Sequence, residues 1–213
     1  MNPTLGYYLM VNLTESTAPM NKPFAESCER NKAPILTVLN QYFAHRTRIL
    51  EIGSGTGQHA VHFAAALPHA IWHTSEMPEN HLGIQLWLDE VKLNNLVDPV
   101  AFTVGQDPWP ALEVDAVFTA NTTHIMQPDE AKVMMQQIAH HLPQGGIFCQ
   151  YGPMRVKGEF TTESNAAFDL SLKSRGFGGI RDIAELQAWG EGLTLIDCVE
   201  MPANNFLLVW EKV

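Results

Sequence analysis

The chain has 213 residues, of which 46% are hydrophobic and 17% are charged. This composition is typical of a globular protein and excludes a disordered or fibrous chain. The 23 acidic residues outnumber the 13 basic residues, which gives a formal net charge of −10. Such an excess argues against binding to nucleic acid, because phosphates attract basic surfaces. The sequence has no apolar run of about eighteen residues, so we expect no membrane span.

The cysteines and the first residues of the chain indicate where the protein is located and how its domain is organised. The histidines bear on metal binding. Cys28, Cys149 and Cys198 are odd in number and lack a C-x-x-C spacing, which predicts reduced thiols in a cytoplasmic protein. No basic residue precedes Lys22, so the start does not resemble a secretory signal. We predict a leader or arm over residues 1–22 and a single domain over residues 23–213. The nine histidines show no zinc-like spacing, and we expect no metal site.

Helical patterns alternate with apolar runs of strand length along the first half of the chain, as in a βαβ architecture. A helix is predicted over 25–43 with a break at Pro34, because proline inside a helix removes a hydrogen bond. The elements predicted after it are a strand at 48–52, a helix at 59–67, a strand at 70–75, a helix at 80–94 and a strand at 100–104.

The second half of the chain continues this alternation and ends in two strands. Its predicted elements are a strand at 115–120, a helix at 128–142, a strand at 147–151, helices at 164–174 and 182–189, and strands at 193–201 and 206–210. A short turn joins the last two strands, so they must pair antiparallel. The predicted fold is α/β: a doubly wound, mostly parallel seven-stranded Rossmann-like sheet with an antiparallel last strand. Ligands of such sheets bind at the carboxyl ends of the strands.

A glycine-rich loop, E-I-G-S-G-T-G over residues 51–57, joins the first predicted strand to the next helix. Glycines there permit a tight turn and let a ligand approach the backbone closely. Their spacing differs from the G-x-G-x-x-G of dinucleotide-binding loops. Glu51 is expected at the mouth of the loop, where its carboxylate would repel a pyrophosphate and attract a cation. The loop therefore favours S-adenosylmethionine, with its ammonium and sulfonium groups, over NAD.

The motif E-x-G-x-G-x-G after a strand resembles the first motif of the class I S-adenosylmethionine-dependent methyltransferases. This resemblance implies S-adenosyl-L-methionine as the cofactor. Glu76, at the end of the second strand, resembles the ribose-binding acid of that class, and Asp107 resembles the acid that accepts the adenine amino group. The residues that we assign to the cofactor are Glu51, Gly53, Ser54, Gly55, Gly57, Glu76, Asp107 and Asn121.

A narrower resemblance rests on a set of short segments that runs from about Phe24 to the end of the chain. Together they resemble a functionally uncharacterised, methyltransferase-like "domain of unknown function" family, which implies a fold and a cofactor but no substrate. The sequence departs from that pattern at Glu76, where the family leads us to expect aspartate. The segments are 34–36, 51–57, 72–76, 120–125, 151–153, 164–169, 179–182 and 201–205.

Residues for the transfer step should follow the fourth and fifth strands or lie in the loops that cover them. His124 is a candidate general base because its intrinsic pKa is near neutral, although it also suits a structural role. Tyr151 could donate to or orient an acceptor, although it also suits the role of a packed tyrosine with a satisfied hydroxyl. A lid is predicted over 155–169, with Glu159, Asn165 and Asp169 as its polar lining. The remaining assignments are Asp169 as catalytic and Asn165 and Asn204 as substrate-binding, although asparagine also favours turns.

The leading hypothesis is an S-adenosylmethionine-dependent methyltransferase that acts on a small-molecule acceptor. The segment 121–124 reads N-T-T-H rather than the N-P-P-Y of enzymes that methylate base amines, so such an activity is not supported. The alternatives are a NAD-dependent oxidoreductase with an atypical glycine loop and a non-catalytic protein that binds S-adenosylmethionine. We expect no nucleic-acid or membrane partner, and a monomer or homodimer.

Overall fold

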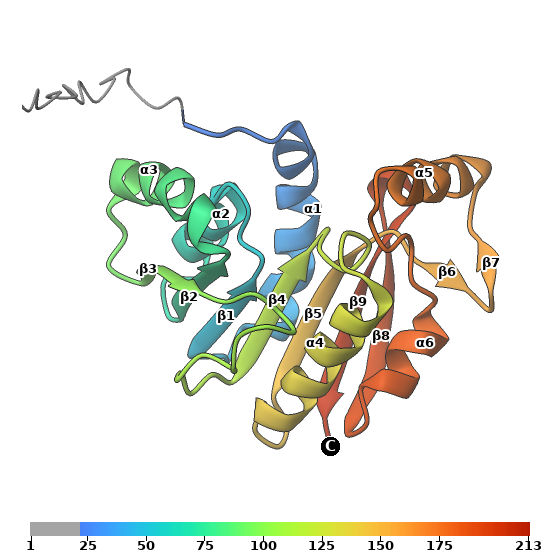
Figure 1. Cartoon of the computed structure of the whole chain (residues 1–213). Helices are drawn as coiled ribbons and strands as arrows, with labels where there is room; N and C mark the ends of the chain where they lie inside the picture. Colours follow the sequence, from blue (N-terminus) through green and yellow to red (C-terminus); the bar gives the residue numbers. More distant parts are fainter. Residues whose placement is uncertain (1–21) are drawn as a thin grey trace, which may run out of the picture.

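The computed structural model describes residues 22–213, so the predicted leader lies outside the described residues apart from Lys22. Seven strands form one sheet in the order β3-β2-β1-β4-β5-β9-β8 (Figure 1). Their bounds are β1 Arg48–Ile52, β2 Ile71–Glu76, β3 Leu96–Ala101, β4 Ala116–Ala120, β5 Ile147–Gly152, β8 Leu193–Met201 and β9 Asn205–Lys212. β9 pairs antiparallel with β5 and β8, whereas the pairs among β1–β5 are parallel. The predicted fold class is confirmed.

Helices cover both faces of this sheet, as the alternation of elements predicts. Their bounds are α1 Glu26–Tyr42, α2 Gln58–Ala66, α3 His81–Val91, α4 Pro128–His141, α5 Glu163–Ser174 and α6 Ile183–Trp189. α1 and α2 pack on one face, where Phe63 and Trp72 are fully buried. α4 and α6 pack on the other face, where Met134 and Trp210 are fully buried. Each face of the sheet thus has its own apolar core.

Two predictions about element bounds are wrong. α1 runs through Pro34 without a break, because Ile35, Val38 and Leu39 on its inner face are buried in the core. The third strand lies at Leu96–Ala101 rather than at 100–104. Pro99 lies inside this strand, and a proline there argues against a strand in the sequence pattern. The structure tolerates it because β3 is at the edge of the sheet.

The segment between β5 and α5 contains a hairpin that the sequence pattern does not reveal. β6 (Arg155–Val156) and β7 (Glu159–Phe160) pair antiparallel and form a separate two-stranded sheet. Short 3₁₀ turns lie at Pro78–Asn80, η1, and at Pro202–Asn204, η2. The second of these joins β8 to β9, so the predicted antiparallel hairpin is confirmed.

Candidate functional site

The carboxyl ends of the parallel strands meet at the upper edge of the sheet in Figure 1. The glycine loop after β1 is held there to the end of β2, because Gly53 N and Ser54 N both donate to Ser75 O, at 3.1 and 3.0 Å. Gly53 has a φ of +72°, and a Cβ at this position would lie 2.5 Å from Thr122 Cγ2. Thr122 belongs to the loop after β4. The missing side chain at Gly53 therefore lets these two loops pack together.

Glu51 lies beneath the glycine loop, and the prediction that it stands at the mouth of the loop is wrong. Only 1% of its surface is exposed. Its Oε2 accepts hydrogen bonds from Ser54 Oγ and Trp72 Nε1, both at 3.0 Å. Burial raises the pKa of Glu51 to about 7, although these two hydrogen bonds oppose the shift. The carboxyl group supports the loop from below, so the argument that it would repel a pyrophosphate loses its basis.

Glu76 ends β2 and borders the glycine loop. Its Oε2 accepts a hydrogen bond from Gly55 N at 2.8 Å, and its Oε1 accepts one from Met77 N at 2.9 Å. A carboxylate oxygen can accept two hydrogen bonds, so each oxygen of Glu76 has capacity for one more donor. Glu76 can therefore order the loop and bind hydroxyl groups of a ligand at the same time.

Asp107 does not follow directly on a strand, because β3 ends at Ala101. Its Oδ2 accepts a hydrogen bond from Thr103 N at 2.7 Å, and its own backbone N–H donates to Thr103 O at 2.9 Å. These bonds close the turn that follows β3. Asp107 therefore shapes the segment that carries Phe102 and Val104. The contact that we assign to it with the adenine of the cofactor stays a prediction.

A cavity of about 360 Å³ lies at the carboxyl ends of β1, β2 and β4 and in the segment after β3, and we call it the first cavity. Its lining residues are Ile52, Gly53, Gly55, Glu76, Met77, Phe102, Thr103, Val104, Ala120, Asn121, Thr122, Ile125, Met126 and Glu130. It includes four of the predicted cofactor residues, namely Gly53, Gly55, Glu76 and Asn121. The other four, Glu51, Ser54, Gly57 and Asp107, lie outside this lining. The walls are mostly apolar, with Glu76 and Glu130 as the carboxylates.

A second cavity, of about 470 Å³, adjoins the first. Its lining residues are Ser27, Asn121, His124, Ile125, Pro153, Ser164, Asn165, Phe168, Ala203 and Asn205. Asn121 and Ile125 line both cavities. Asn121 directly follows β4 with a φ of +59°, a conformation that asparagine adopts more readily than most residues. Its position marks the junction between the two cavities.

His124 lies in the second cavity with 6% of its surface exposed. Its ring meets that of Phe168 edge to face, with the centroids 5.5 Å apart. Burial lowers the pKa of His124 to about 4, and the charge of Arg175 adds to this effect. The imidazole is therefore neutral at pH 7, with one nitrogen that donates and one that accepts. One ring nitrogen can accept a proton, but burial disfavours the charged imidazolium that would result.

The other two predicted catalytic residues do not line either cavity. Tyr151 is buried in the core, and burial raises the pKa of its hydroxyl. Asp169 Oδ1 accepts a hydrogen bond from Ile180 N at 2.7 Å. Its Oδ2 forms an ion pair with Lys173 Nζ, also at 2.7 Å. The structure places His124 in the second cavity and leaves Tyr151 and Asp169 outside both linings.

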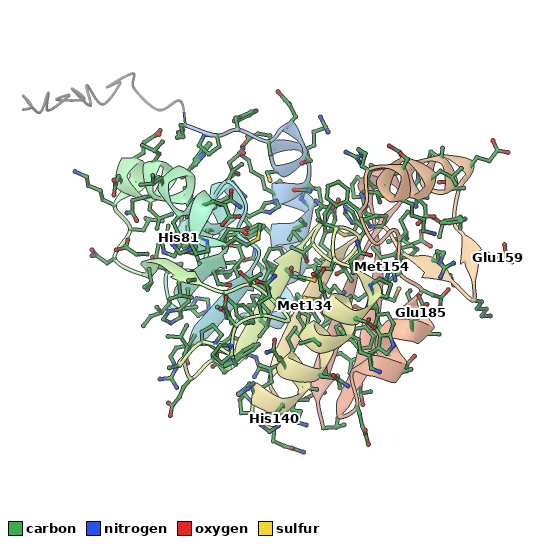
Figure 2. All side chains as sticks on the ribbon, in the orientation of Figure 1. His81, Met134, His140, Met154, Glu159 and Glu185 are labelled. Carbon is green, nitrogen blue, oxygen red and sulfur yellow. The ribbon has the colours of Figure 1, made fainter. Side chains whose placement is uncertain are left out.

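The predicted substrate residues lie at the β8–β9 turn and on α5, far apart in sequence. Asn165 lines the second cavity, and its Nδ2 donates to Thr161 Oγ1 and to Asn204 O, both at 3.0 Å. Asn204 contributes that carbonyl, but its side chain is outside the lining. Figure 2 shows Glu159 on the outer side of the β6–β7 hairpin, so it does not form part of the predicted polar lining.

Several residues of the second cavity escaped the sequence-based assignment. Ser27 comes from the start of α1, outside the segments that carry the family resemblance, whereas Asn205, at the start of β9, lies in the segment 201–205. Pro153 and Phe168 lie in segments that carry the family resemblance, which is the signal that could have identified them.

The described region, residues 22–213, also bears on metal binding and on membrane insertion. No group of three or more His, Cys, Asp or Glu side chains there is arranged to hold a metal ion. Within the same residues, every helix is too short or too polar to cross a bilayer.

Comparison with protein families gives a match over residues 22–212 to the family described as "Protein of unknown function (DUF938)". The chain belongs to this family. The description of DUF938 names no activity, so the family carries no substrate assignment.

Among solved structures, the chain is similar to human N-acetylserotonin methyltransferase in complex with SAM, with a TM-score of 0.75, 15% identity and coverage of 88% of this chain and 53% of that one. It is also similar to PigF with SAH, with a TM-score of 0.71, 22% identity and coverage of 88% and 64%. A third match is the O-methyltransferase family 2 protein from Planctomyces limnophilus DSM 3776 in complex with apigenin, with a TM-score of 0.70, 17% identity and coverage of 85% and 62%.

These likenesses show the fold. This DUF938 chain has the class I methyltransferase fold and spans a little over half to under two thirds of the length of those three chains.

Proposed function

We propose that the chain is a methyltransferase that uses S-adenosylmethionine to methylate a small molecule. The observation that carries the proposal is the pair of cavities that adjoin at Asn121, one beside the glycine loop and one beneath α5. A group-transfer enzyme needs two ligands whose reacting atoms meet, and adjoining cavities provide such an arrangement. The shared fold with methyltransferases, two of them bound to SAM or SAH, supports the same reading.

The lining of the first cavity suits this cofactor. Glu76 can accept both ribose hydroxyls with the lone pairs that the backbone leaves free. Met77, Phe102 and Val104 offer an apolar wall for the adenine ring. A Cβ on Gly55 would meet no atom within 4 Å, so the loop leaves open space beside Glu76. We place the methionine portion along the side that Gly53 and Asn121 share.

S-adenosylmethionine supplies a methyl group on a positively charged sulfur. Asn121, which lines both cavities, would position the acceptor next to that group. The acceptor also loses a proton, and the neutral imidazole of His124 is the group in the second cavity that can take it. Tyr151 and Asp169 hold the surrounding segments in place.

Ligand-dependent unfolding tests the cofactor. A ligand at 100 times its dissociation constant stabilises the folded state by about 2.7 kcal/mol. We expect S-adenosylmethionine and S-adenosylhomocysteine to raise the melting temperature, and NADH to leave it unchanged. NADH is the required comparison, because the burial of Glu51 removes the charge argument against a dinucleotide. A shift with NADH alone would favour an oxidoreductase, and no shift with millimolar S-adenosylhomocysteine would refute the proposal.

A further inference from the structure

The second cavity has a polar lining without a formal charge. Within the described residues, the polar side chains that line it are serines, asparagines and His124, and burial keeps His124 neutral. Arg175 is the charged group that acts on His124, but its guanidinium lies over the Phe177 ring, 5.3 Å from the centroid, and outside the lining. An ionised ligand would lose its hydration here without gaining a counterion, which is costly.

His124 presents unused hydrogen-bonding capacity to this cavity. The residue as a whole is 94% buried, and neither ring nitrogen has a hydrogen-bond partner among residues 22–213. Neither nitrogen is among the fully buried unpartnered atoms of these residues. Because His124 lines the second cavity, its ring nitrogens can offer this capacity to a ligand there. A Cβ built on Gly152 would lie 3.8 Å from His124 Nδ1 and 4.0 Å from Asn121 Oδ1. The missing side chain of Gly152 thus leaves space where both polar groups can be reached.

Two exposed apolar side chains form the other wall. Phe168, on α5, is 37% exposed, and Ile125, which follows β4, is 41% exposed. Both line the second cavity, and the Phe168 ring packs edge to face against His124. Aromatic rings favour edge-to-face or offset-stacked partners, so this wall suits a planar ring. Such a ring would cover Phe168 and bring its substituents to His124.

We propose that the second cavity binds a small, uncharged aromatic compound that bears a hydroxyl group, and that His124 accepts a hydrogen bond from that hydroxyl. The inference rests on the proposed function, because the hydroxyl at the junction becomes the methyl acceptor. The hydroxyl oxygen forms its bond to the methyl carbon, the carbon–sulfur electron pair goes to sulfur, and the hydroxyl proton goes to His124.

Three probes with the same ring test the chemistry of the cavity. 2-Naphthol is uncharged and has the hydroxyl, 2-naphthoate is an anion, and naphthalene has no polar group. Equilibrium dialysis with the full chain, with and without saturating S-adenosylhomocysteine, gives the affinity of each. We expect 2-naphthol to bind at least about tenfold more tightly than either comparison compound. Equal binding of 2-naphthoate, or no binding of 2-naphthol, would overturn the inference.

Variants locate the binding. Phe168→Ala should weaken 2-naphthol binding about tenfold or more, whereas Leu170→Ala, at a 70% exposed position of the same helix outside the lining, should not. His124→Leu should abolish the preference for 2-naphthol over naphthalene. Should that variant fold poorly, Gly152→Ala is the substitute, because its methyl group makes only ordinary contacts and narrows the space beside His124. Wild-type affinity for 2-naphthol in Phe168→Ala or Gly152→Ala would contradict the assigned position.

The same dialysis separates the two proposals. If S-adenosylhomocysteine binds and 2-naphthol does not, the further inference fails and the proposed function stands. If S-adenosylhomocysteine does not bind, the proposed function fails, and 2-naphthol binding in its absence still reports on the cavity.

Discussion

Glu76→Ala is expected to weaken the binding of S-adenosylhomocysteine by at least about 30-fold. The substitution removes the carboxylate that lines the first cavity and that accepts hydrogen bonds from Gly55 N and Met77 N. A hydrogen bond to a charged group contributes about 1.5–3 kcal/mol, and tenfold in affinity is about 1.4 kcal/mol. Loss of two ribose contacts therefore has a large effect, and isothermal titration calorimetry measures it directly.

Glu79→Ala is the matched control for this experiment. Glu79 lies in η1, three residues beyond Glu76, is exposed, and is outside the first cavity. Glu79→Ala changes the net charge by the same amount as Glu76→Ala. A difference in affinity between the two variants therefore reports the lost hydrogen bonds and not the change in overall charge. Equal affinities for wild type and Glu76→Ala would mean that the ribose does not lie against Glu76.

Glu51→Gln is expected to change how the free energy of unfolding depends on pH. Burial raises the pKa of Glu51 in the folded state from about 4.5 to about 7. The folded state therefore holds this proton more tightly than the unfolded state does. The stability that results is present below about pH 4.5 and is lost as the pH rises through about 7. Glutamine has no such proton, and its Oε1 can still accept from Ser54 and Trp72.

Denaturant unfolding of both proteins between pH 5 and pH 8 measures the effect. Relative to Glu51→Gln, wild type should lose roughly 2–3 kcal/mol of stability over this range, since one pKa unit corresponds to about 1.4 kcal/mol. Other groups with displaced pKa values, such as His59, titrate alike in both proteins and cancel in the difference. Parallel curves for the two proteins would show that Glu51 is ionised throughout and that its buried environment has been misjudged.

The fold could be predicted because its signals are local. Strand-length apolar runs, helical spacing and the short turn before Asn205 determine the element order and the antiparallel last strand. The third strand was misplaced because its interior proline contradicts the usual strand pattern. The effect of Pro34 was overestimated because helix propensity was weighed without the buried contacts that hold α1 against the sheet.

The site could be predicted only in part, because its geometry depends on tertiary packing. Gly53, Gly55, Glu76 and Asn121 lie at or just beyond the carboxyl ends of strands, so the topology alone brings them to one cavity. The burial of Glu51 depends on the indole of Trp72, which comes from the neighbouring strand. The second cavity needs α1, α5 and the β8–β9 turn to converge, and the sequence contains no spacing that reports this convergence.

A crystal structure of the full chain with S-adenosylhomocysteine tests the central claim most directly. The account predicts the ribose against Glu76, the adenine between the apolar residues of the first cavity, and the sulfur beside Asn121, facing the second cavity. A sulfur atom that faces away from the second cavity, or a ligand bound elsewhere on the protein, would contradict it.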